Sequence, residues 1–339
     1  MPATDRRIIL RADGGTQIGL GHIYRLLAVC EMLKDTYNCI FAINHPDEKV
    51  KQLVEGFCPV AALQSADTHG ELKELEQMVT RNDSVIADGY TFDYEYLSQL
   101  RAMSDKLVMI DDMADRKVTA DIIINHGRSG IESQYGNTGA QSVLCGFRYL
   151  LLRKEFLQAA RQQRSVEAVN SLFICLGGAD INNLTLKFLK AAVKVGFIKT
   201  IKIVIGAAYR HKQELNGFIN TVADKTAEIF EGVNSSEMIR LIQACQVAVS
   251  PASTTSLEIC CAKSGLITGC SADNQLNILT ELLAKGCGTS IGNFNTVSEA
   301  EIIKALEHYN NPARANRDMQ HQALAIDGLS GERIRAILN

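Results

Sequence analysis

Hydrophobic residues follow a regular alternation along the 339-residue chain. Short runs rich in β-branched residues, typical of buried strands, are separated by longer segments in which apolar residues recur at helical spacing. Within 23–33 the apolar positions fall at i, i+3, i+4, i+7 and i+10, which predicts one buried helical stripe in a helix beginning at Gly21–His22. Such alternation is typical of parallel sheets covered by helices.

The alternation occurs in two series. Strands of the first are predicted near Arg7–Ala12, Cys39–Ile43, Ser84–Ala87, Leu107–Ile110 and Asp121–Asn125. After a predicted helix over Leu150–Arg164 and the polar stretch Gln162–Asn170, the second series has strands near Leu172–Leu176, Ile201–Ile205, Ala227–Phe230, Val247–Ser250, Leu266–Thr268 and Gly288–Ile291. Its helices are predicted near Asn183–Val195, His211–Val222, Ser236–Ala244, Thr255–Ala262, Leu276–Lys285 and Ser298–His308.

This pattern predicts an α/β protein with two facing, Rossmann-like, doubly wound domains and a cleft between them. We expect an N-terminal domain over residues 1–165 and a C-terminal domain over residues 166–312. A helical tail over residues 313–339, broken at Asp327–Gly328, could pack across both domains.

Composition narrows the range of partners. Lys and Arg number 35 against 38 Asp and Glu, and no basic run provides a footprint for nucleic acid. The ten cysteines are scattered without a C-x-x-C pair, so we expect buried reduced thiols and no metal site. No apolar stretch approaches the length of a membrane span, and no leader peptide is apparent, so we expect a cytoplasmic protein that is a monomer or a weak homo-oligomer.

In parallel sheets, ligands bind beyond the carboxyl ends of strands, so the strand-to-helix loops are the candidate sites. The first runs from Ala12 to His22, and Gly19 and Gly21 allow a ligand to approach its backbone closely. Tyr24 stands where a dinucleotide fingerprint requires its third glycine, so we expect no nicotinamide cofactor. The helix dipole disfavours the cationic form of His22, which favours a neutral imidazole that can act as a general base. The alternative is a histidine that caps a turn or fills the core.

The second loop, Leu176–Asp180, contains Gly177 and Gly178 ahead of the helix near Asn183. Backbone amides there, together with the helix dipole, could hold a diphosphate without a metal. An ordinary strand-to-helix turn explains the glycines equally well.

The third loop, Ser250–Glu258, brings hydroxyls and amides of Ser253 and Thr254 to a helix start. Glu258, one turn inside that helix, could accept hydrogen bonds from both hydroxyls of a ribose. Thr255-x-x-Glu258 also matches a capping box, which would give the glutamate a structural role.

The fourth loop, Ser271–Gln275, offers the amides of Asn274 and Gln275 to sugar hydroxyls or acetamido groups, unless they cap the next helix. Tyr90 follows a strand end and would point into the cleft. Asp111–Asp112 also ends a strand, but no third metal ligand lies nearby in sequence, so we interpret this pair as structural or electrostatic.

Several of these segments together resemble one family. The first loop carries Arg11-Ala12-Asp13, Gln17-Ile18-Gly19-Leu20-Gly21-His22 and Arg25. Further matching segments are Gly146-Phe147-Arg148-Tyr149, Leu152-Arg153-Lys154-Glu155-Phe156, Leu176-Gly177-Gly178-Ala179-Asp180, Ser253 to Glu258, Asn274-Gln275 and Ala284-Lys285-Gly286. They resemble, in order and over essentially the whole chain, PseG, the family of UDP-2,4-diacetamido-2,4,6-trideoxy-β-L-altropyranose hydrolases of pseudaminic acid synthesis.

This resemblance implies a GT-B fold similar to that of the glycosyltransferase MurG, with a UDP-sugar as substrate and no metal or cofactor. It implies that His22 activates water for inverting attack at the anomeric carbon and that Tyr90 and Asn274 line the sugar site. Glu258 would bind the ribose, and the backbone near Gly232–Val233 would read uracil. The product sugar would enter flagellin glycosylation or a surface polysaccharide.

Three other functions remain open at the level of sequence. A GT-B glycosyltransferase would pass the sugar to an acceptor, and a UDP-sugar 2-epimerase would use several acid–base groups. A non-catalytic UDP-sugar sensor or scaffold would bind without turnover.

Overall fold

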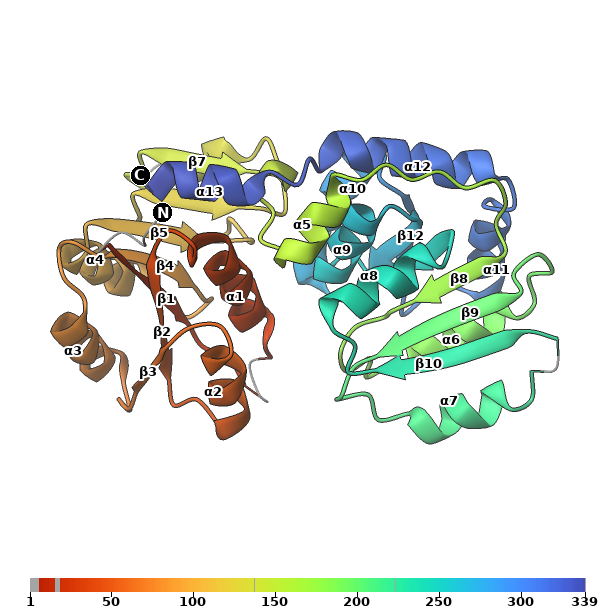
Figure 1. Cartoon of the computed structure of the whole chain (residues 1–339), viewed down its shortest axis with the longest axis horizontal. Coiled ribbons are helices and arrows are strands. Elements are labelled where there is room, and N and C mark those ends of the chain that lie inside the picture. Colours follow the sequence, from red (N-terminus) through yellow and green to blue (C-terminus); the bar gives the residue numbers. More distant parts are fainter. Residues whose placement is uncertain (1–5, 16–18, 137, 223, 339) are drawn as a thin grey trace. The chain divides into compact units, whose positions relative to one another are not determined.

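The computed structural model describes residues 6–15, 19–136, 138–222 and 224–338. The chain divides into two compact units, of which the first comprises Met1–Lys154 with Leu329–Asn339 and the second Glu155–Gly328 (Figure 1). The first unit therefore ends at Lys154, where we expected it to reach residue 165. Helix α5 (Lys154–Ala160) lies almost wholly in the second unit, where the Lys263 ammonium donates a hydrogen bond to the Ala160 carbonyl.

The first unit contains a seven-stranded sheet in the order β3-β2-β1-β4-β5-β6-β7, with every neighbouring pair parallel. Its strands are β1 (Arg7–Ala12), β2 (Asn38–Asn44), β3 (Val60–Leu63), β4 (Ser84–Asp88), β5 (Lys106–Ile110), β6 (Ile122–Asn125) and β7 (Ser142–Cys145). The connecting helices are α1 (Gly21–Leu33), α2 (Glu48–Glu55), α3 (Thr68–Met78), α4 (Tyr94–Met103) and the 3₁₀ turns η1 (Glu132–Tyr135) and η2 (Phe147–Tyr149). The five predicted strands are all present, and β3 and β7 extend the sheet at its two edges.

The second unit contains a six-stranded parallel sheet in the order β10-β9-β8-β11-β12-β13. Its strands are β8 (Ser171–Ile174), β9 (Thr200–Ile205), β10 (Thr226–Glu231), β11 (Val247–Val249), β12 (Gly265–Cys270) and β13 (Thr289–Asn293). Its helices are α6 (Leu184–Ala192), α7 (Lys212–Ile219), α8 (Ser235–Gln243), α9 (Thr254–Ala262), α10 (Leu276–Ala284), α11 (Glu299–Glu307) and α12 (Pro312–Ala325), with the 3₁₀ turn η3 (Asp273–Gln275). The prediction of two doubly wound parallel halves is confirmed.

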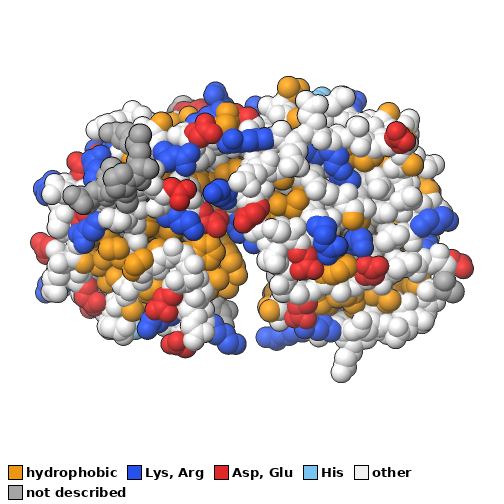
Figure 2. Space-filling view, in the orientation of Figure 1, with side chains coloured by type: hydrophobic (Ala, Val, Ile, Leu, Met, Phe, Trp, Pro, Cys, Tyr) orange, Lys and Arg blue, Asp and Glu red, His pale blue; other side chains and the backbone are white. Residues whose placement is uncertain are grey.

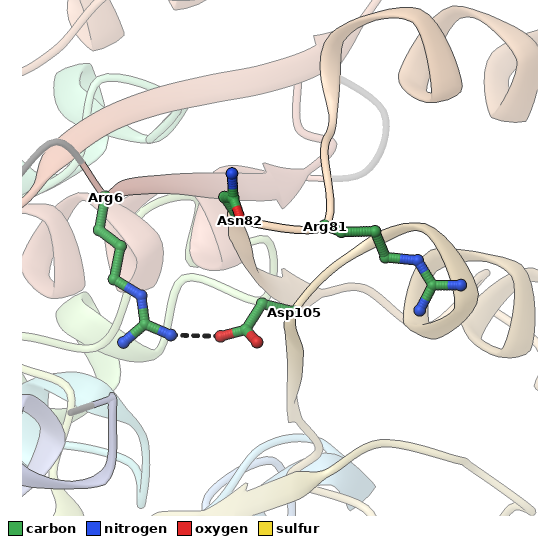
Figure 3. Close-up of a pocket in the computed structure, with 4 residues that line it drawn as sticks. All are labelled: Arg6, Arg81, Asn82 and Asp105. Carbon is green, nitrogen blue, oxygen red and sulfur yellow. Dashed lines mark hydrogen bonds and ion pairs between the residues drawn. The ribbon is translucent and has the colours of Figure 1, made fainter.

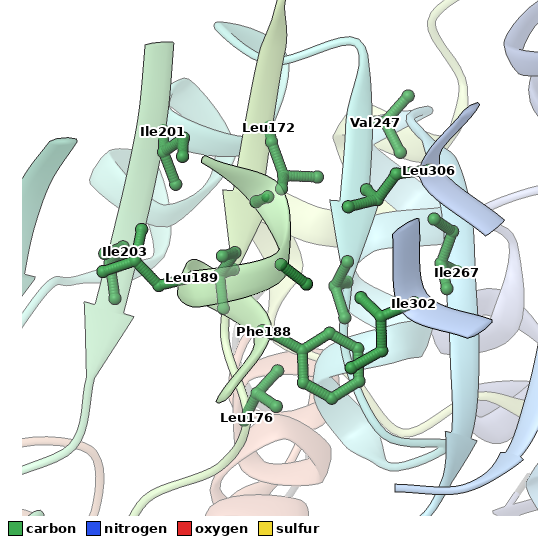
Figure 4. Packing of buried hydrophobic residues seen from close by; sticks show 14 of the residues in the cluster. Leu172, Leu176, Phe188, Leu189, Ile201, Ile203, Val247, Ile267, Ile302 and Leu306 are labelled. Carbon is green, nitrogen blue, oxygen red and sulfur yellow. The ribbon is translucent and has the colours of Figure 1, made fainter. Parts of the chain in front are cut away.

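Apolar side chains from strands and helices form the core of the second unit. Figure 4 shows Phe188 and Leu189 of α6 together with Ile302 and Leu306 of α11, facing apolar residues of β8, β9, β11 and β12. Full burial of a side chain of this size contributes about 1.5–3 kcal/mol. This cluster therefore fixes α6 and α11 on one face of the sheet.

The last two helices belong to different units. Helix α12 packs against β12 and α9 of the second unit. Helix α13 (Ser330–Leu338) packs against α1 and η2 of the first unit, where Arg335 Nη1 donates to the Met32 carbonyl at 2.7 Å. The chain thus returns to its first unit at Leu329, after the predicted break at Asp327–Gly328.

Figure 2 shows acidic and basic side chains mixed over the visible face of each unit. No helix in the described part of the chain is long and apolar enough to cross a membrane.

Candidate active site

The loop between β1 and α1 presents His22 in the first turn of α1. Gly15 and Gly19 exchange backbone hydrogen bonds of 3.1 and 2.8 Å, and Gly19 has a φ of +84° that favours glycine. Gly21 is the first residue of α1, and the candidate stripe of that helix, from Ile23 to Leu33, is buried as predicted. Residues 16–18 of the loop lie outside the described residues, so the match at Gln17-Ile18 has no structural account.

Asp88 orients the imidazole of His22. The Asp88 carboxylate, fully buried at the end of β4, places Oδ1 2.7 Å from His22 Nδ1. Arg25 Nη2 also lies 3.1 Å from Nδ1, but the contact with Asp88 is shorter. Because an ionised carboxylate only accepts hydrogen bonds, we assign the proton of the neutral ring to Nδ1, which leaves the lone pair on Nε2. His22 is 8% exposed, so the ring has little freedom to turn. An imidazole held in this way by a carboxylate is chemically able to act as a general base.

Arg25, one turn after His22 on α1, holds Asp88 in its ionised form. Arg25 Nε and Nη2 donate to the two oxygens of Asp88, each at 2.5 Å, and Arg25 Nη1 donates to Asp112 Oδ2 at 2.7 Å. Burial by itself would raise the pKa of Asp88, but the charge of Arg25 and the hydrogen bonds from His22 and Arg25 together outweigh it and lower that pKa overall. The same opposition lowers the pKa of Asp112.

Tyr90 lies beside His22. The two rings are 4.6 Å apart between centroids and nearly perpendicular, at 81°. The Tyr90 hydroxyl donates to Asp112 Oδ2 at 3.2 Å, while 47% of the residue stays exposed. The structure therefore brings together Tyr90 and His22, which we had selected from separate strand ends.

Sequence reasoning missed the charged groups that connect these two residues. In the sequence, Asp88 and Asp112 are acidic residues at strand ends, and Arg25 lies shortly after the glycine loop. The sequence did not show that these three residues pair with one another. The i, i+3 spacing of His22 and Arg25 was an available signal, because it places both side chains on the same face of α1. His126 also lies here, with Nε2 3.4 Å from Arg25 Nη1. Burial and the nearby Arg25 charge lower the pKa of His126 to about 4.

In the second unit, the Gly177–Gly178 loop follows β8, and Gly177 has a φ of +105°. The first two amides of the helix that follows are occupied. Asp180, itself buried, accepts hydrogen bonds from the backbone amides of Leu184 at 2.8 Å and Thr185 at 2.7 Å. This carboxylate also adds a negative charge at the start of α6, so the diphosphate contact that we expected here stays a prediction for the amides of the glycine loop.

Helix α9 begins one residue earlier than predicted, and its cap differs. Ser253 is the N-cap, and the Ser256 hydroxyl accepts a hydrogen bond from the Ser253 amide at 3.2 Å. The alternative capping box Thr255-x-x-Glu258 is therefore wrong. Glu258 lies one turn further along α9 and is buried, so capping does not explain it.

The remaining predicted residues follow strand ends of the same sheet. Gly232–Val233 follows β10, and Gly232 has a φ of +67°. Asn274 is exposed within η3, whereas Gln275 Oε1 accepts from the Ser271 amide at 2.7 Å and so braces the loop from within. Residues 177–178, 233, 253–258 and 274–275 thus all follow the carboxyl ends of β8, β10, β11 and β12.

Two cavities among the described residues lie away from His22 and from these loops. One of about 290 Å³ is lined by residues that precede β1, β4 and β5, including Arg6 and Asp105, which form an ion pair (Figure 3). These residues belong to the amino ends of the strands, opposite His22. Within the described residues, no group of three or more His, Cys, Asp or Glu side chains is arranged to hold a metal ion.

Comparisons with known proteins identify several relatives of this chain. No family model matches the chain. It is 26% identical over 285 residues to the UDP-2,4-diacetamido-2,4,6-trideoxy-beta-L-altropyranose hydrolase of Campylobacter jejuni, covering 83% of this chain and 97% of that protein. It is 24% identical to the spore coat polysaccharide biosynthesis protein SpsG of Bacillus subtilis over 96% of both. A 26% match to the uncharacterized protein MJ1062 of Methanocaldococcus jannaschii covers 69% of this chain but only 50% of that protein.

Solved structures show the same fold. MurG of Acinetobacter baumannii superposes with a TM-score of 0.70 at 11% identity over 98% of each chain. A putative UDP-N-acetylglucosamine 2-epimerase of Listeria monocytogenes superposes with a TM-score of 0.64 at 10% identity, covering 99% of this chain and 96% of that one. The chain has the GT-B fold, and its resemblance to the PseG hydrolase is confirmed across most of its length.

Proposed function

We propose that this protein is a UDP-sugar hydrolase that converts UDP-2,4-diacetamido-2,4,6-trideoxy-β-L-altropyranose into the free sugar and UDP, in pseudaminic acid biosynthesis. The observation that carries the proposal is the His22–Asp88 pair, in which Nδ1 is committed to the carboxylate and Nε2 is the basic nitrogen. The relative from Campylobacter jejuni, matched over 83% of this chain, supports the choice of substrate. Such an enzyme would act in the cytoplasm, and its product would enter flagellin glycosylation or a surface polysaccharide.

In the proposed reaction, His22 Nε2 removes a proton from water as the water oxygen attacks the anomeric carbon from the face opposite the nucleotide. The bond between that carbon and the phosphate oxygen breaks, its electron pair leaves with UDP, and the configuration inverts. UDP is a good leaving group, so a base for water and donors for the phosphates suffice. Asp88, ionised beside Arg25, stabilises the imidazolium that forms.

The second unit is proposed to hold UDP. The first amides of a helix have no intrahelical acceptor, so α9 offers backbone donors at Thr254, next to Ser253, for the diphosphate. Gly177 and Gly178 would add further amides, Glu258 would accept the ribose hydroxyls, and the backbone at Val233 would contact uracil. Asn274 and Gln275 would face the sugar.

The test is incubation of the purified protein with the UDP-sugar alone, followed by NMR of the products. Release of UDP and free sugar without an acceptor supports a hydrolase. Transfer that requires an acceptor would indicate a glycosyltransferase, and solvent exchange of the proton at C2 would indicate an epimerase. Binding without any turnover would indicate a sensor or scaffold and would refute the proposed activity.

A further inference from the structure

We propose that Asp112 fixes the direction of the Tyr90 hydroxyl, so that Tyr90 accepts a hydrogen bond from a donor group of the sugar and thereby acts in substrate specificity. The donor would be an amide N–H or a hydroxyl. This inference rests on the proposed function, because it states which kind of sugar group the same site recognises.

The direction of the hydroxyl follows from the groups around Asp112. Tyr90 Oη lies 3.2 Å from Asp112 Oδ2, and Arg25 Nη1 donates to the same oxygen at 2.7 Å. Burial raises the pKa of Asp112, but the charge of Arg25 and its hydrogen bond together outweigh burial and lower that pKa overall, so this carboxylate carries no proton at neutral pH. It can only accept, and the phenolic proton must therefore point toward Asp112.

The phenolic oxygen then has only its lone pairs left for a ligand. Burial, and next to it the negative charge of Asp112, raises the pKa of Tyr90 to about 12. The phenol therefore stays protonated at neutral pH. With 47% of the residue exposed beside His22, the oxygen is available to accept from a bound sugar.

Arg116 holds the backbone that carries Tyr90. Its guanidinium donates to the carbonyl oxygens of Gly89 at 2.7 Å and Phe92 at 3.3 Å, and also to the carbonyl of Tyr90 itself. With His22 against the ring and Asp112 at the hydroxyl, the phenol is held at its backbone, its face and its tip. A contact that is fixed in this way can select among sugars without rearranging.

The first experiment measures kcat and KM for UDP-2,4-diacetamido-2,4,6-trideoxy-β-L-altropyranose in Tyr90→Phe, Asp112→Ala and the double variant. Tyr90→Phe removes the acceptor, and Asp112→Ala removes the carboxylate that fixes the phenolic proton, so the hydroxyl is free to turn. Loss of one neutral hydrogen bond corresponds to about a threefold to tenfold rise in KM. We expect each single variant to show that rise in KM, and we expect Tyr90→Phe to keep kcat within about threefold of wild type, the pattern of lost ground-state binding.

The double variant decides whether Asp112 acts through Tyr90. We expect Asp112→Ala to raise KM no further in the Tyr90→Phe background, because the two changes affect one contact. A full additional effect there, or a Tyr90→Phe variant with normal KM, overturns the inference. Asp105→Ala, which removes a carboxylate paired with Arg6 at the amino ends of the strands, is the matched control and should leave KM unchanged.

A second readout does not depend on turnover. In protein labelled with ¹³Cζ-tyrosine, the spectrum of Tyr90→Phe assigns the Tyr90 resonance. Asp112→Ala should shift that resonance and Asp105→Ala should not, and an unmoved resonance overturns the contact. A wild type that binds the UDP-sugar without hydrolysing it refutes the proposed activity alone, and dissociation constants then replace KM. A wild type that does not bind it refutes both proposals.

Discussion

At the scale of single residues, the site depends on which atoms carry protons. His22, Asp88 and Arg25 form a chain in which a buried cation keeps a buried carboxylate ionised, and the carboxylate selects one tautomer of the imidazole. The burial cost of such charges is recovered only when every member is paired. Removal of one member is therefore expected to affect the others.

His22→Ala tests the proposed base. General-base catalysis typically contributes a factor of about 10² to 10⁴, so kcat should fall by at least that much. The UDP contacts proposed for the second unit are untouched, so the dissociation constant for UDP should stay within about twofold of wild type. Stopped-assay kinetics and calorimetric UDP titration measure the two quantities. Near-normal hydrolysis by this variant would remove His22 from the mechanism.

Asp88→Asn tests the orienting carboxylate. An asparagine side chain can present its N–H₂ group to Nδ1, which favours the tautomer with the proton on Nε2, where water must be activated. We expect kcat to fall at least tenfold, while the dissociation constant for UDP changes little. Asp105→Asn is the control for the same chemical change at a distant site. Unchanged kcat in Asp88→Asn would show that Asp88 does not act through His22.

At the scale of elements, strand prediction succeeded for the buried strands and missed the two edge strands of the first sheet. Strands β1, β4 and β5 are apolar over nearly their whole length because neighbouring strands and helices cover them. Strands β3 and β7 have four residues each, lie at the edges of the first sheet and are partly exposed, so each offers only a short pattern. The edge strands β10 and β13 of the second sheet, with six and five residues, were predicted.

Helix starts were predicted well, but their caps were not. The first turns of α6 and α9 look alike in sequence, since each follows a loop rich in small or hydroxyl residues. Asp180 closes the start of α6, whereas Ser253 and Ser256 form the cap of α9. This difference is what makes α9 the better candidate for the diphosphate.

Asp180→Ala tests whether the Asp180 carboxylate caps the N-terminus of α6. The change removes two accepted hydrogen bonds and a favourable charge at the helix N-terminus, which is worth about 0.5–2 kcal/mol. We expect the free energy of unfolding, measured in urea, to fall by about 1 kcal/mol. Asp273→Ala, an exposed aspartate of the same unit, is the control and should change it little. Equal stability of Asp180→Ala and wild type would contradict the cap.

At the scale of the whole molecule, the order of the elements along the chain does not decide which unit each element belongs to. Helix α13 is the last element of the chain, yet it completes the first unit by packing on α1, the helix that carries His22. Its Ile334 is 1% exposed. The folding of the proposed catalytic unit therefore depends on residues more than 300 positions from His22 in the chain.

Ile334→Ala tests whether α13 stabilises the first unit. A cavity left by this change typically costs about 2–5 kcal/mol, and the loss should fall on the first unit. Hydrogen exchange followed by mass spectrometry should show faster exchange in α1, with α12 unchanged. Ile302→Ala, at an equally buried site of the second unit, should show no faster exchange in α1. Faster exchange in α12 rather than α1 would contradict the assignment.

The sequence by itself determined the two doubly wound halves, the position of His22 in the first turn of its helix, and the strand ends from which the candidate residues arise. These features are local, because period and turn chemistry act over a few residues. Tertiary structure alone decided that Asp88 pairs with His22, that Asp112 accepts a hydrogen bond from the Tyr90 hydroxyl and that α13 returns to the first unit. Those contacts join residues from 22 to about 300 positions apart, and which of the many compatible charges meet depends on the packing of the sheets and helices between them.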